Sequence, residues 1–474
     1  MAPETLSPIT KEILDQCPRL RVLVVGKSGV GKSSLISYSF GVDMKSVAHG
    51  ERGVCDIKDG IISAENDRFV LHDSMGFESG DTKNFTIVKN FLKSRSGNDI
   101  DLPERIHVVW LCIKVPHANE RVFETGDEAL LKLASDMKVP IVVVFTQFDK
   151  LFNSVERDLP EDTPDEEIDE LCDKKFDGLC VEPLRNIGST LKYGRSSGLS
   201  GKKHAKPDRE ALEHLITVTR DLVETDVKEM WLATTMAQRA SARMKIEDSI
   251  KVGMKRYWAG LPSNTRFRGS KLDDCLAAVH EELTDTWNFN DPNCLLLGAE
   301  FRKNIKNLAA GVTQSDEEAK CLMDNIINQE TPQFAQFAQS WAGLAGAAAA
   351  AFIDPVTASI PVIGWLVTFT ANIYHDNPQT LRFLMCYIID LTLVLDKLFV
   401  QAILVGPRSL TDADIEEALK EYKASNMWEV HRDIRQYAKD VDFVDTVVST
   451  APEKVMERLI LKYSSCRKSG ISMS

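Results

Sequence analysis

Gly26-Lys27-Ser28-Gly29-Val30-Gly31-Lys32-Ser33 is the stretch that decides the fold, because it matches the phosphate-binding pattern G-x-x-x-x-G-K-[ST]. The apolar, β-branched run 20–25 before it predicts a buried strand. Residues 34–40 after it predict the first turns of a helix. A glycine-rich surface turn could match by chance. However, a strand before the loop and a helix after it are the context in which this pattern forms a site.

Each part of this loop has a chemical role toward phosphate groups. The glycines let the backbone curl so that N–H groups point at phosphate oxygens, and the following helix adds its positive N-terminal end. Lys32 is expected to reach the β- and γ-phosphates, and the Ser33 hydroxyl is expected to ligate Mg²⁺, which prefers oxygen. We therefore predict that the loop and the next residue, Ser34, contact a nucleotide, with Lys32 as a catalytic residue and Ser33 as a metal ligand.

A second chemical signal is Asp73-Ser74-Met75-Gly76, a D-x-x-G pattern at the end of a predicted strand. That strand, 68–71, is expected to pair with 61–63 in a hairpin across the polar turn 64–67. Asp73 is predicted to hold Mg²⁺ through a water molecule. The N–H of Gly76 is predicted to contact the γ-phosphate and to act in catalysis, so the segment could change shape when that phosphate is lost.

A third signal, Thr146-Gln147-Phe148-Asp149, fits the [NT]-[KQ]-x-D pattern that recognises guanine. The Asp149 carboxylate can accept hydrogen bonds from N1–H and the exocyclic N2–H₂ of guanine together. Adenine offers no such pair of donors, so its entry would leave a charge unpaired. Thr146 and Gln147 are expected to tie this base loop to the phosphate loop and to cover the base.

Strands alternate with helices in the first part of the chain. This pattern predicts an α/β P-loop fold with a mostly parallel sheet, covered on both faces, and one antiparallel pair. Further buried strands are expected at 106–113 and 139–145. A last strand, expected at 190–193, leads to Ser197 and Gly198, where a loop of small residues is predicted to complete the base pocket.

From residue 223 the apolar spacing becomes helical. We expect a lead-in over 1–18, a nucleotide-binding domain over 19–222 and an all-α domain over 223–474. The stretch 341–371 has two apolar limbs of about a dozen residues, short of the roughly 20 that span a bilayer. Two interpretations stay open: a buried helical hairpin, which short apolar runs favour, and a hairpin that enters a membrane or a partner when the nucleotide changes. The charged residues of the long helix 380–405 favour a core helix.

Composition narrows the function. A chain of 474 residues exceeds one ordinary domain, and its 43% hydrophobic content is that of a folded protein. The net charge of −13 argues against binding nucleic acid, which needs a basic face. The N-terminus shows no signal peptide. The ten cysteines include no C-x-x-C pair, so neither zinc nor disulfides are expected, and they indicate reduced thiols in an intracellular, cytoplasmic protein.

These motifs together resemble the translation-factor-like branch of P-loop GTPases. The loop GKSGVGKSS looks closest to those of septins, immunity-associated AIG-type GTPases and Era-like proteins. The segments 69–78 and 287–289 carry a wider similarity to fungal proteins known only as G-domain-containing. The resemblance implies binding of GTP and GDP, Mg²⁺ and slow hydrolysis.

Two departures from that resemblance affect catalysis. Ras-like members place a water-orienting glutamine after the D-x-x-G glycine, where this chain has Phe77. Hydrolysis would then need a partner chain, a homodimer across the nucleotide, or the neighbouring Glu78. The loop 41–60 contains no threonine for Mg²⁺, although Ser46 or Ser63 could substitute.

Three other functions stay open. The chain could be a nucleotide switch with negligible turnover, a membrane-associated dynamin-like GTPase, or a P-loop ATPase. Asp149 argues against the last of these.

Overall fold

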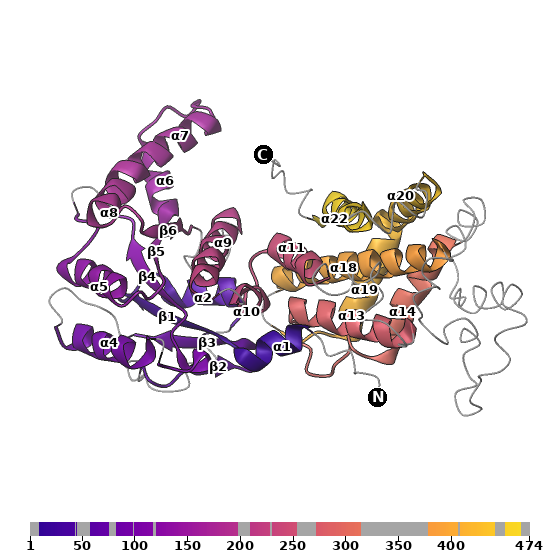
Figure 1. Ribbon diagram of the computed structural model, residues 1–474. Helices are drawn as coiled ribbons and strands as arrows, with labels where there is room; N and C mark the ends of the chain where they lie inside the picture. Colours follow the sequence, from indigo (N-terminus) through magenta and orange to yellow (C-terminus); the bar gives the residue numbers. More distant parts are fainter. Residues whose placement is uncertain are drawn as a thin grey trace, which may run out of the picture. The chain divides into compact units, whose positions relative to one another are not determined.

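The computed structural model forms two compact units, Ile13–Ser241 and Met1–Glu12 with Ala242–Ser474, and each has its own apolar core (Figure 1). The residues that the structure describes are 9–42, 44, 57–74, 82–97, 99–116, 120–197, 209–227, 230–253, 272–313, 378–405, 408–440 and 451–465.

The first unit is built on a six-stranded sheet of order β2-β3-β1-β4-β5-β6. Only β2 and β3 pair antiparallel; the other neighbours are parallel, which confirms the predicted α/β fold class. The strands are β1 (Leu20–Gly26), β2 (Ile61–Ser63), β3 (Asn66–Asp73), β4 (Val108–Lys114), β5 (Ile141–Thr146) and β6 (Lys192–Arg195).

The register brings the carboxyl ends of the central strands together. Val24 of β1 lies opposite Asp73 of β3, and Gly26 lies opposite Cys112 of β4. Lys114, at the end of β4, lies opposite Thr146 of β5. Ligands of open α/β sheets bind outside the carboxyl ends of the strands. The three predicted motifs therefore begin on the same side of the sheet, at the carboxyl ends of its strands.

Alternate residues of the central strands face different helices. Val109 and Leu111 of β4 belong to a core shared with Phe91 of α4 (Thr82–Arg95) and Leu130 of α5 (Thr125–Asp136). Trp110 between them faces the other way, and its indole N–H donates to the Thr219 hydroxyl of α9 (Arg209–Asp226) at 3.1 Å. Successive side chains of a strand point to opposite faces, so helices pack on both faces of the sheet.

The remaining helices of the first unit complete these layers. On the Trp110 face, the Phe40 ring of α2 (Lys32–Phe40) stacks on Phe69 at 3.9 Å between centroids. The acidic stretch 154–178 is exposed on one side only, because Val155, Ile168 and Phe176 join the core. The other helices are α6 (Phe148–Arg157), α7 (Asp165–Phe176), α8 (Glu182–Ile187) and α10 (Met230–Ala237). The first unit also takes in the second half of α1 (Ile9–Gln16), which lies within the expected lead-in.

The buried side-chain amide of Asn66 makes β3 begin earlier than the sequence predicted. The Asn66 side chain is 2% exposed, and its Nδ2 donates to the carbonyls of Phe40 and Ala237, both at 2.7 Å. Asn66 therefore belongs to β3 rather than to the turn expected over 64–67. The same contact holds α10 to the sheet, within the compact unit Ile13–Ser241.

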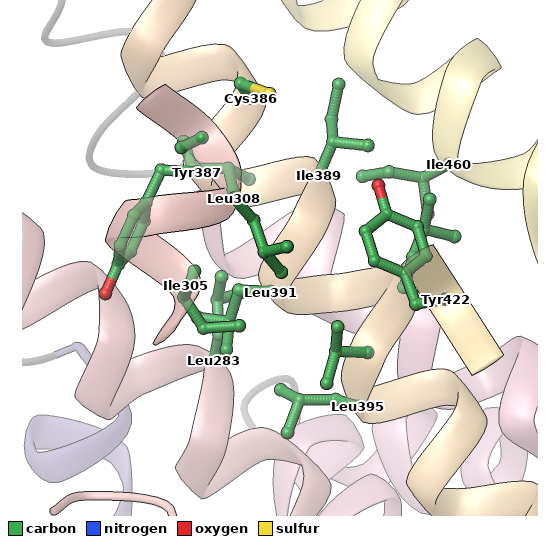
Figure 2. Packing of buried hydrophobic residues seen from close by; sticks show 14 of the residues in the cluster. Leu283, Ile305, Leu308, Cys386, Tyr387, Ile389, Leu391, Leu395, Tyr422 and Ile460 are labelled. Carbon is green, nitrogen blue, oxygen red and sulfur yellow. The ribbon is translucent and has the colours of Figure 1, made fainter. Parts of the chain in front are cut away.

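The second unit is helical and packs around α18 (Pro378–Val405), which is buried along most of its length. Figure 2 shows Tyr387, Leu391 and Leu395 of α18 among side chains from its neighbours. Those neighbours are α11 (Ala242–Gly253), α13 (Leu272–Trp287), α14 (Ala299–Ala310), the 3₁₀ turn η4 (Gly311–Thr313), α19 (Asp412–Ser425), α20 (Met427–Asp440) and α22 (Ala451–Tyr463).

Thr411 and Asp414 form a capping box at the start of α19. Asp390 and Asp396 of α18 are fully buried. Among the described residues, no helix combines the length and the apolar character needed to cross a bilayer. The stretch 341–371 lies outside the described residues.

Candidate nucleotide-binding site

The phosphate loop has a backbone that only glycine adopts easily at three positions. Gly26 has φ 153°, and a Cβ there would lie 2.4 Å from the Cys112 carbonyl oxygen of the neighbouring strand. Gly29 and Gly31 have φ of 75° and 100°, in the left-handed region. Gly31 is also the N-cap of α2, and its carbonyl accepts from the Leu35 N–H at 3.0 Å. The loop thus turns sharply out of β1 into a helix N-terminus.

The Lys32 side chain lies over this loop. Its ammonium group donates to the carbonyls of Gly26 at 2.9 Å and Lys27 at 3.1 Å. Lys27 itself forms an ion pair with Glu124, the N-cap residue of α5. Sequence reasoning did not anticipate the role of Glu124, because it is far from the motif along the chain.

The other loop residues differ in exposure. Ser28 and Ser33 are exposed, Ser34 is half-buried, and Val30 is only 5% exposed. The two exposed hydroxyls are free to meet a ligand from solvent, whereas Val30 packs into the protein. Val30 would therefore contribute its backbone N–H rather than its side chain.

Asp73 ends β3 beside the loop. Its Oδ1 is buried and has no hydrogen-bond partner among the described residues. Burial raises the pKa of the Asp73 carboxyl above its usual range, and the Lys32 cation partly offsets this. A buried carboxylate oxygen without a protein donor fits a hard cation such as Mg²⁺. Gly76, Phe77 and Ser46 lie outside the described residues. Ser63, the other candidate for the missing threonine, donates its hydroxyl to Glu65.

The base loop contacts the phosphate loop. Thr146 is buried, and its hydroxyl donates to the Ile113 carbonyl at 3.4 Å. Gln147 has φ 62°, and its side-chain amide donates to the Gly29 carbonyl at 3.1 Å. Asp149 is half-buried in the first turn of α6. One hydrogen bond therefore fixes the guanine-type motif against the phosphate-type motif.

The segment after β6 is held against the base loop by the backbone of Ser196. The Ser196 N–H donates to the Phe145 carbonyl at 2.9 Å, and its own carbonyl accepts from the Phe148 N–H at 3.2 Å. Ser197 follows and is half-buried. Gly198 lies outside the described residues. The sequence pointed to Ser197 but not to Ser196, whose contribution comes from its backbone and leaves no residue-type signal.

Comparison with known proteins agrees with this geometry. Residues 21–147 match the protein family described as 50S ribosome-binding GTPase. Among curated proteins, GTPase Era of Bordetella petrii is 25% identical over 202 residues, which cover 36% of this chain and 68% of Era. The family match over residues 21–147 includes the phosphate loop, Asp73 and the start of the base loop. The first unit therefore carries a GTP-binding P-loop GTPase domain.

The rest of the chain has a different match. Residues 295–469 match a family described as a domain of unknown function, DUF8505. A solved structure of the LeoA bacterial dynamin GTPase from ETEC is 12% identical, covering 95% of this chain and 86% of LeoA at a TM-score of 0.30. A TM-score of that size does not establish a shared fold. The septin-like and immunity-associated classes and the fungal relatives remain hypotheses.

Proposed function

We propose that this protein binds guanine nucleotides with Mg²⁺, hydrolyses GTP slowly to GDP and phosphate, and couples the nucleotide state to its helical unit. The observation that carries the proposal is the hydrogen bond from Gln147 to the Gly29 carbonyl. It sets a guanine-reading loop at a fixed place beside a loop built for phosphates. Asp73, with its unpartnered buried oxygen, supports the same proposal.

The reaction is the attack of water on the γ-phosphorus. The bond between that phosphorus and the oxygen of the β-phosphate breaks, and negative charge develops on that oxygen. The Lys32 ammonium group donates to two carbonyl dipoles in this structure. Replacing a carbonyl by a charged phosphate oxygen strengthens the hydrogen bond, because both partners are then ionised. Lys32 is therefore placed to stabilise the leaving group.

Two residues would hold the metal ion. The Ser33 hydroxyl and the Asp73 carboxylate are the oxygen ligands, with Asp73 acting through water. Bound there, Mg²⁺ would neutralise charge on the β- and γ-phosphates. Gly76 would contact the γ-phosphate through its backbone N–H.

Base selection falls to Asp149. Its carboxylate accepts from N1–H and N2–H₂ of guanine. Xanthine carries a carbonyl in place of the amino group at position 2, so it repels this carboxylate. An asparagine at the same place could donate to that carbonyl while its oxygen still accepts from N1–H. A single change of side chain should therefore change the preferred base without changing the loop.

The test measures binding of fluorescent GTP, ATP and xanthosine triphosphate to the full chain. We expect Lys32→Ala to lose GTP binding. We expect Asp149→Asn to bind GTP at least tenfold more weakly and to gain xanthosine triphosphate. Lys93→Ala, which removes an exposed lysine of α4 away from the three motifs, serves as the control. Unchanged GTP binding by Lys32→Ala would contradict the proposal, as would an ATP preference that persists in Asp149→Asn.

A nucleotide switch with negligible turnover is the second candidate. The observation that favours it is Phe77, which cannot orient a water molecule as glutamine does. Both candidates bind GTP, so only the rate of phosphate release separates them.

A further inference from the structure

Three buried side chains with metal-binding atoms meet inside the helical unit. Cys386 and Asp390 lie one turn apart on α18, and His431 comes from α20. Their exposures are 0%, 0% and 3%, and one ligand atom of each lies within 4.8 Å of the other two. The mechanism proposed above uses none of them.

One oxygen of Asp390 lies between the other two residues. Asp390 Oδ2 is 3.4 Å from Cys386 Sγ and 3.1 Å from His431 Nε2. In a tetrahedral zinc site, Zn–S of about 2.3 Å and Zn–N or Zn–O of about 2.0–2.2 Å separate sulfur from a nitrogen or oxygen ligand by about 3.5–3.7 Å, and nitrogen from oxygen by about 3.3–3.6 Å. The two observed distances are slightly shorter, so these side chains need to move apart by only a few tenths of an ångström to share one ion.

The surrounding residues hold this arrangement in place. The Tyr422 hydroxyl of α19 donates to the other carboxylate oxygen, Asp390 Oδ1, at 2.5 Å. His431 Nε2 lies 3.1 Å from Oδ1 as well as from Oδ2, so the imidazole faces both carboxylate oxygens, whereas the Cys386 contact is to Oδ2. The His431 ring packs against Gly311, where a Cβ would come within 3.6 Å of Nδ1. Such outer contacts are what fix the ligands of protein metal sites. Figure 2 shows Cys386 and Tyr422 within the core of the unit.

Charge also fits a divalent ion. With a divalent cation bound, a thiolate and a carboxylate would together cancel its charge, so the ion and these two ligands would carry no net charge in the core.

We propose that Cys386, Asp390 and His431 bind one Zn²⁺ ion, with water in the fourth position, and that this site fastens α20 to α18. Thiolate, imidazole and carboxylate together suit zinc and not magnesium, which takes oxygen ligands. The sequence has no C-x-x-C pair, and it therefore did not predict a zinc site. Here the ligands are a cysteine and an aspartate four residues apart, and a histidine from another helix, a spacing that no common zinc motif has.

The test measures metal content of the full chain, purified without chelators, by plasma mass spectrometry. We expect about one zinc per chain, and less than a tenth of that in Cys386→Ser and in His431→Gln. Cys180→Ser is the matched control, because Cys180 is equally buried but lies in the other unit. Far-ultraviolet circular dichroism checks that each variant is folded.

A second readout uses the wild-type chain, so it stays valid even if the Cys386 and His431 variants do not fold. Replacing the metal with Co²⁺ should give the wild-type chain a thiolate-to-cobalt charge-transfer band. Cys180→Ser should keep that band. A wild-type chain with neither zinc nor the cobalt band would overturn the proposal and leave a hydrogen-bonded network only. Zinc retained in a folded Cys386→Ser would overturn it as well.

Discussion

Gly26 is the residue at which the strand and the phosphate loop depend on each other most directly. A side chain there would meet the Cys112 carbonyl at 2.4 Å, and that carbonyl belongs to the adjacent strand, which cannot move without the sheet. The pattern G-x-x-x-x-G-K-[ST] requires a glycine at this position but does not say why. The structure gives a steric reason besides the need for N–H groups that face phosphate.

The first prediction follows from that contact. Gly26→Ala should lower the free energy of unfolding by about 2–4 kcal/mol, because the neighbouring strand must shift or the loop must change its path. Gly29→Ala, where no atom lies within 4 Å of the added Cβ, should cost only about 1–2 kcal/mol for its left-handed backbone. Urea unfolding of both variants measures the difference. Equal losses of stability in the two variants would show that backbone strain, and not the Cys112 contact, causes the destabilisation.

At the scale of elements, α9 is attached to the sheet through a buried polar contact. Thr219→Val removes the acceptor of the Trp110 indole N–H, which lies 3.1 Å from the hydroxyl, while keeping the shape of the side chain. The unpaired donor should cost about 1–3 kcal/mol. Thr225→Val on the exposed face of the same helix is the control and should cost less than about 0.5 kcal/mol. A Thr219→Val variant as stable as its control would mean that the indole finds another partner.

The start of α19 gives a prediction in pH. Hydrogen bonds from Arg408 and Thr411 lower the pKa of Asp414 from 3.8 to about 2. The folded state thus favours the charged carboxylate, so its stabilising effect is complete above pH 3.8 and is lost as the pH falls toward 2. Asp414→Asn should cost about 1 kcal/mol at pH 7, as losses of helix caps do. Thermal midpoints of the two chains should converge toward pH 2, and a constant difference would contradict this account.

The sequence predicted elements well where one short pattern specifies strand, loop and helix, as from 20 to 40. It predicted the limits of elements less well where contacts between residues far apart in the sequence determine them. Asn66 looked like a turn residue, yet carbonyls of α2 and α10 draw it into β3. In the site, motif residues were found by pattern, whereas Glu124 and Ser196 were missed because their contacts exist only in three dimensions.

At the scale of the whole molecule, two units with separate cores divide the chemistry. The nucleotide motifs lie in the first, and the match to the domain of unknown function lies in the second. The apolar sequence of 341–371 is the feature that motivates the hypothesis of membrane contact. Flotation with lipid vesicles, with and without GTP, would remove the dynamin-like alternative if the protein never rises with the lipid.

The last prediction concerns how the whole chain completes its catalytic site. With Phe77 after the D-x-x-G glycine, one chain lacks the usual group that orients water. If a second copy supplies it across the nucleotide, GTP turnover per chain should rise with protein concentration and level off once dimers form. Light scattering on the same samples should show the mass double over that range. A low rate that stays flat would contradict the dimer. It would instead favour a switch whose activator is a separate protein, to be sought among partners of the helical unit.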